Sequence, residues 1–72
     1  MDERAYQVSG MIVERKLVAL RKRLVEAQRG LILHAAETDT LPTSSALRQI
    51  ADLESAIVAT ETMIEEQRVQ GN

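Results

Sequence analysis

The stretch "AETDTLPTSS", residues 36–45, interrupts a chain that is otherwise patterned for helix. Asp39, Thr40 and the serines that follow are residues typical of turns and helix caps. Pro42 disfavours helix in the residue before it and is well tolerated in a first helical turn. We therefore expect a turn at about residues 37–42. A second helix should start near Thr43 or Ser44, whose hydroxyl can cap it.

A first helix is predicted before this turn, over about residues 2–36. Its apolar residues recur at intervals of four and three, as in a heptad seam; they are Val13, Leu17, Leu20, Leu24, Ala27 and Leu31. Gly10 weakens the beginning of the pattern, because glycine costs about 1 kcal/mol relative to alanine inside a helix. Residues 1–10 are therefore expected to fray.

The second helix is predicted over about residues 43–69, with Gly71 just past its end. Its seam has the same alternation of four and three and consists of Ala46, Ile50, Leu53, Ile57, Thr60 and Ile64. A short loop between two helices makes them antiparallel neighbours. The fold class is therefore all-α, a single coiled-coil-like helical hairpin over residues 1–72. The longer first helix leaves about ten N-terminal residues to overhang, fray or meet another chain.

Length and composition limit what the chain can be. A core of 72 residues rarely supplies more than about 3–5 kcal/mol, so we expect the hairpin to be oligomeric or bound to a partner. The absence of cysteine excludes disulfides and thiolate metal sites and fits a reducing cytoplasm. No apolar run approaches the roughly 20 residues of a membrane span. The opening "MDERAYQVSG" is acidic and does not resemble a secretory signal.

A second apolar row runs along the first helix at a strict interval of seven. It lies about 100° around the helix from the row of Leu17, Leu24 and Leu31. It consists of Met11, Val18, Val25 and Ile32. Scattered surface valines are common and need no explanation. Four consecutive heptads favour a different interpretation, in which the second helix covers the seam and a protein partner binds this row. We therefore predict the second row to be the partner-binding site.

Charge is divided unevenly along the chain. Residues 1–36 hold seven basic and four acidic side chains, whereas residues 37–72 hold two basic and seven acidic ones. A basic strip follows the first helix at Arg15, Lys16, Lys22, Arg23 and Arg29. Such a strip can track phosphates, but the chain has one aromatic residue for stacking and a pI of 5.3. We expect a solvated face or ion pairs to the acidic second helix, and no specific nucleic-acid binding.

Catalytic and metal-binding patterns were sought among the remaining polar residues. His34 is the single histidine and suits a cation near a helix C-terminus. Glu61, Glu65 and Glu66 have the spacing of an ordinary solvated helix face. No nucleophile triad, phosphate loop or metal motif is present. The chain is therefore predicted not to be an enzyme and to need no cofactor or metal.

The stretch "ADLESAIVATETMIEEQ", residues 51–67, resembles the second helix of the small needle co-chaperones of type III secretion systems, the YscE-like family. The local match is Leu53-Glu54-Ser55-Ala56-Ile57. The basic, leucine-rich "LVALRKRLVEAQRGL", residues 17–31, is similar in style to the first helix of that family. The resemblance implies a two-helix hairpin that pairs in the cytoplasm with a larger TPR-like chaperone. It further implies that the pair holds the needle subunit monomeric before export.

Two other functions remain open from the sequence. Two copies of the hairpin could form an antiparallel four-helix bundle that is structural or binds RNA through the basic strip. Alternatively, the chain could be a small regulator or phage-encoded inhibitor that docks on one target. All three functions use packing surfaces rather than reactive groups.

Overall fold

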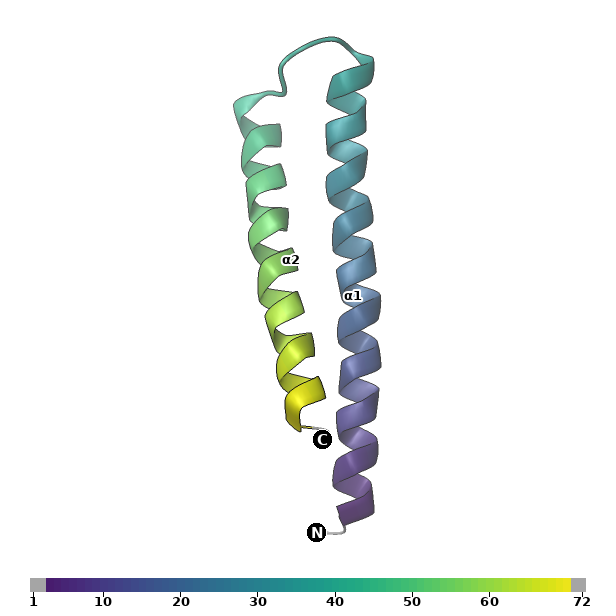
Figure 1. The fold of residues 1–72 in the computed structure, drawn as a ribbon. Helices are drawn as coiled ribbons and strands as arrows, with labels where there is room; N and C mark the ends of the chain where they lie inside the picture. The colour runs from purple at the N-terminus through teal and green to yellow at the C-terminus, as the bar shows by residue number, and fades with distance from the viewer. Residues whose placement is uncertain (1–2, 71–72) are drawn as a thin grey trace.

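The computed structural model describes residues 3–70 as two helices, α1 (Glu3–Glu37) and α2 (Ser44–Gln70), joined by one loop. The helices run antiparallel, so the start of α1 and the end of α2 lie toward the end of the molecule opposite the loop (Figure 1). The predicted all-α hairpin is confirmed. Each helix begins and ends one residue later than expected. Residues 3–10, which were expected to fray, are part of α1. Residues 1 and 2, included in the expected fraying, lie outside the described residues.

The loop is held by the hydroxyl residues at its two ends. At the end of α1, the Thr38 backbone N–H donates to the His34 carbonyl at 3.1 Å, and the Thr38 hydroxyl lies at the same distance from the Ala35 carbonyl. Asp39 then adopts a left-handed φ of 54°, a conformation that ends many helices. At the start of α2, the Thr43 hydroxyl accepts a hydrogen bond from the Ala46 backbone N–H at 3.1 Å. Thr43 is therefore the N-cap of α2.

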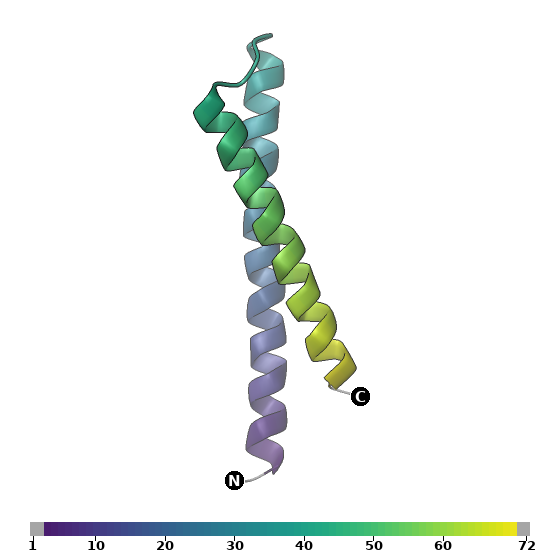
Figure 2. The ribbon, with the colours of Figure 1, turned by 90° about the vertical axis from the view of Figure 1, so that its left-hand side faces the viewer.

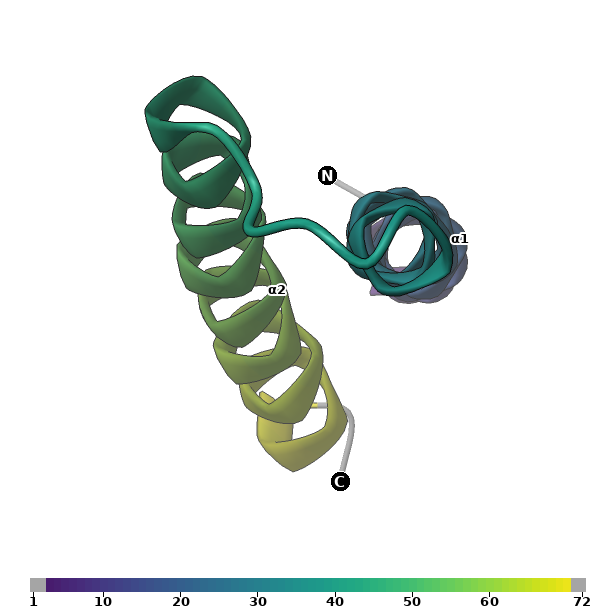
Figure 3. The ribbon, with the colours of Figure 1, turned by 90° about the horizontal axis from the view of Figure 1, so that it is seen from above.

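The axes of the two antiparallel helices cross at an angle. Seen from the side of α2, this helix runs diagonally across α1 (Figure 2), and seen from above it slants away while α1 is viewed end-on (Figure 3). The molecule is accordingly long and thin, with extents of 56 × 17 × 15 Å and a radius of gyration of 16.6 Å. A compact domain of this length has a radius of gyration of about 11 Å. The end of α1 near the N-terminus extends past α2 (Figure 1).

The core between the helices is narrow. Ile57 and Ile64 are its buried apolar side chains among the described residues, with exposed fractions of 6% and 5%. Thr60 is buried between them, and its hydroxyl donates to the Ala56 carbonyl at 2.7 Å. On α1, the facing leucines are only half-buried: Leu17, Leu24 and Leu31. Two helices cannot enclose a core, so much of the apolar surface stays in contact with solvent.

Candidate interaction surfaces

Three polar contacts run along one margin of the seam between the helices. Arg21 Nε lies 2.8 Å from Glu61 Oε2. Toward the loop, Gln28 Nε2 donates to Glu54 Oε2 at 2.9 Å and also reaches the Ile50 carbonyl at 3.4 Å. Toward the chain ends, Arg68 Nε lies 3.2 Å from Glu14 Oε1.

These contacts share one period. Each step of seven along α1, from Glu14 to Arg21 to Gln28, is matched by a step of seven backward along α2, from Arg68 to Glu61 to Glu54. An interval of seven returns to nearly the same face of a helix. The contacts therefore set one antiparallel register along the hairpin. They also hold one row of α1, here called the polar row (Glu14, Arg21 and Gln28), against α2.

The seam on α1 consequently differs from the predicted one. Val13 and Leu20 were expected in the seam but are 40% and 37% exposed, and Ala27 is exposed as well. The physical reason is that α2 packs over the row of Leu17 and over the polar row. Its contact with α1 is therefore turned away from the row of Val13 and Leu20. Of the remaining predicted seam residues, Ile57, Thr60 and Ile64 are buried, and those that are half-buried are Leu17, Leu24, Leu31, Ala46, Ile50 and Leu53.

The side of the hairpin that carries the polar contacts, here called the paired side, also carries the second row. Met11, Val18 and Ile32 are 56%, 45% and 47% exposed, whereas Val25 is half-buried. Val18, Val25 and Ile32 each follow a residue of the polar row by four positions, which places them on its flank. The predicted partner-binding row is thus exposed to solvent except at Val25.

Three exposed residues of α2 border the paired side opposite the second row. Leu47 and Val58 are each 53% exposed, and Val69 is 66% exposed. These three residues are not among the predicted site residues, because their interval is eleven rather than seven. Eleven residues also make nearly whole helical turns, about 3.67 residues each, so this spacing was the available signal. The paired side therefore has apolar residues on both helices and polar contacts between them.

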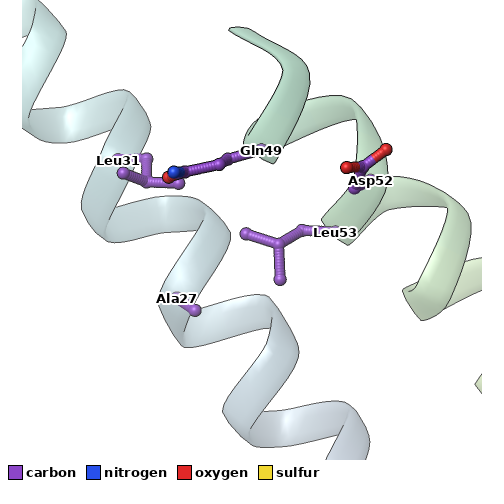
Figure 4. Close-up of a pocket in the computed structure, with 5 residues that line it drawn as sticks. All are labelled: Ala27, Leu31, Gln49, Asp52 and Leu53. Atoms are coloured by element: carbon purple, nitrogen blue, oxygen red, sulfur yellow. The ribbon is translucent and has the colours of Figure 1, made fainter. Parts of the chain in front are cut away.

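The opposite side, here called the open side, is formed by two other rows. On α1 it carries Val13, Leu20 and Ala27; on α2 it carries Gln49, Ala56 and Met63. A hollow of about 520 Å³ lies there, lined by Ala27, Leu31, Gln49, Asp52 and Leu53. Leu53 points toward α1, and Gln49 reaches toward Leu31, whereas Asp52 turns away from α1 (Figure 4). The hollow reaches the half-buried seam residues Leu31 and Leu53 directly.

The basic strip faces solvent. Its members Arg15, Lys16, Lys22, Arg23 and Arg29 are all exposed. The ion pairs between the helices, over the part of the chain that the structure describes, are instead made by Arg21 and Arg68. The strip thus remains a solvated face in the isolated hairpin, and the expectation of no specific nucleic-acid binding stays a prediction.

Across residues 3–70, the structure brings together no group of three or more His, Asp or Glu side chains suited to a metal ion. His34 is exposed in the last turn of α1, and Glu61 is paired with Arg21. Neither α1 nor α2, as described, has a segment apolar and long enough to span a membrane.

Comparison of the chain with protein-family models, with curated proteins and with solved structures gives no match. The surfaces of the hairpin itself therefore carry the functional argument.

Proposed function

We propose that this hairpin is a protein-binding accessory subunit whose paired side docks on a larger helical partner. The observation that carries the proposal is the second row, because Met11, Val18 and Ile32 are about half exposed along one side of α1. Burying one Val or Ile side chain is worth about 1.5–3 kcal/mol. A partner that covers this row would therefore gain several kcal/mol before the costs of association.

The paired side suits a helix as its partner. Val58 of α2 borders this side across from Val25, so apolar contacts are offered on both helices. The ion pair between Arg21 and Glu61 lies between them and is about 45% exposed on each side chain. A helix laid along this side needs apolar residues at its margins and polar groups toward the centre.

Together with the resemblance of residues 17–31 and 51–67, these features lead us to propose a cytoplasmic co-chaperone of a type III secretion system. In this role the hairpin stabilises a TPR-like chaperone, which in turn holds the needle subunit monomeric before export. The chemistry of this role is burial of apolar surface, and no catalytic group is required.

The experiment is co-expression with the TPR-like chaperone and the needle subunit of a type III system encoded in the same genome. Copurification of a stoichiometric complex, and a higher melting temperature for the chaperone, are expected. The test variant is Val18→Asp with Ile32→Asp, since both residues are exposed and Val25 is not. It should keep its helical circular dichroism and bind the chaperone at least about 100-fold more weakly, because a carboxylate is costly to bury unpaired.

Leu20→Asp is the matched control, because Leu20 is a similarly exposed aliphatic residue of α1 on the open side. It should bind the chaperone as the wild type does. Failure of the wild-type hairpin to bind any such chaperone would reject the co-chaperone role. Binding that is lost with Leu20→Asp and kept with the double variant would reject the paired side as the docking surface.

A further inference from the structure

We infer that the open side is covered by a second copy of this chain, which completes a four-helix bundle. The rows that face solvent there include Val13, Leu20 and Met63, which are 40%, 37% and 48% exposed. Met63 precedes the buried Ile64 in α2, so a second layer on this side would extend the existing core. This inference does not rest on the proposed chaperone, which would bind the opposite side.

The surface area supports association on this scale. The hairpin exposes 5996 Å², whereas a compact monomer of 8.0 kDa exposes about 4,450 Å². The difference is about 1,500 Å², and a standard-size interface buries about 800 Å² on each partner. The hairpin thus has enough surface beyond that of a compact monomer to form an interface of ordinary size.

Charge at the two edges of the open side favours a second copy over an unrelated protein. The outer edge on α1 carries Lys16 and Arg23, seven residues apart. The outer edge on α2 carries Asp52 and Glu66, separated by two heptads, together with Arg48 near the loop. A two-fold axis parallel to the helices sets the basic edge of one copy beside the acidic edge of the other. Such self-complementarity is characteristic of an isologous interface.

The register of the hairpin brings one basic and one acidic residue of these edges to the same height. The contact between Glu14 and Arg68 places residues 16 and 66 at the same level along the molecule. Under an axis parallel to the helices, Lys16 of one copy therefore lies level with Glu66 of the other. Arg23 lies between the levels of Glu66 and Asp52. An axis perpendicular to the helices would place the two basic edges together instead. The charges therefore select the arrangement in which both loops are at the same end.

Sedimentation of two matched variants tests the surface. The wild type is expected to be a dimer at tens of micromolar concentration. Leu20→Asp on the open side should weaken dimerisation by at least about 100-fold, because the interface would have to bury an unpaired carboxylate. Val18→Asp, two residues away on the paired side, should leave it unchanged. Met63→Asp repeats the test from α2, so that a folding defect of one variant, seen by circular dichroism, does not decide the outcome.

Spin labels on the loop test the arrangement. Leu41 is 91% exposed and the chain has no cysteine, so Leu41→Cys gives a single labelling site. Loops at the same end should give a label-to-label distance below about 30 Å, because neighbouring helix axes lie about 10 Å apart. Loops at opposite ends would be separated by about the length of α2, roughly 40 Å.

A distance near 40 Å would overturn the charge-directed arrangement. A wild-type protein that is still monomeric at 100 µM would overturn the interface. A dimer unaffected by both Leu20→Asp and Met63→Asp would also overturn it. Loss of chaperone binding by the variants of Val18 and Ile32, with the dimer intact, would concern only the proposed partner.

Discussion

Arg21 and Glu61 face each other across the hairpin, with Arg21 Nε 2.8 Å from Glu61 Oε2, at the middle of three polar contacts spaced by seven residues. Both side chains are about 45% exposed, so solvent screens their attraction. The pair therefore contributes to the register of the hairpin more than to its stability.

Arg21→Ala should lower the free energy of unfolding by less than about 1 kcal/mol, as for other exposed ion pairs. The loss should shrink further in 1 M salt, where charges are screened within about 3 Å. Urea unfolding at low and high salt measures both effects. The exchanged pair Arg21→Glu with Glu61→Arg should recover the wild-type stability, and a loss of several kcal/mol from Arg21→Ala would contradict this view.

Ile57→Ala should be among the most destabilising substitutions, because Ile57 is 6% exposed in a core with few buried side chains. Truncation of a buried isoleucine to alanine costs about 2–5 kcal/mol. This equals much of the stability expected from so small a core. Thermal unfolding followed by circular dichroism should show the loss. The adjacent Val58→Ala is the control, since Val58 is 53% exposed and its truncation should change the free energy of unfolding by less than about 0.5 kcal/mol.

Thr60→Val should raise the stability of the hairpin. Thr60 is 6% exposed, and its hydroxyl donates to the Ala56 carbonyl one turn earlier, a contact that adds little to helix stability. Valine has nearly the same shape and gains apolar burial without leaving an unsatisfied donor. A gain of about 0.5–1 kcal/mol would raise the melting temperature by a few degrees. Lower stability for Thr60→Val than for wild type would mean that the hydroxyl has a further partner.

Asp39→Gly should also stabilise the loop, because Asp39 holds a φ of 54° that glycine adopts without strain. We expect a gain of about 0.5–1 kcal/mol, and Asp39→Ala should lose a similar amount because alanine tolerates this region poorly. Equilibrium urea unfolding of the three proteins should rank them glycine, aspartate, alanine. An alanine variant at least as stable as the glycine variant would show that the loop relaxes to another conformation.

The arrangement of the chain into two helices and a turn was predictable from the sequence. Local chemistry is sufficient for this, since Thr43 caps the helix that follows Pro42. The face of α2 was also predictable, because the row that includes Ile57 and Ile64 is the only broad apolar stripe of that helix. A single apolar stripe has one way to be buried, so its periodicity determines its orientation.

The face of α1 that meets α2 was decided only in the tertiary structure. Apolar residues of α1 extend around nearly half of the helix, from the row of Leu20 past the row of Leu17 to the row of Val18, and a single partner helix can cover only part of that width. Periodicity cannot choose among these positions. The choice depends on the polar row, because Arg21 and its neighbours in that row find partners only when α2 lies above them. Those partners are 26 to 54 residues away in the sequence. Long-range polar pairing of this kind left Leu20 and Val18 exposed on opposite sides of the hairpin.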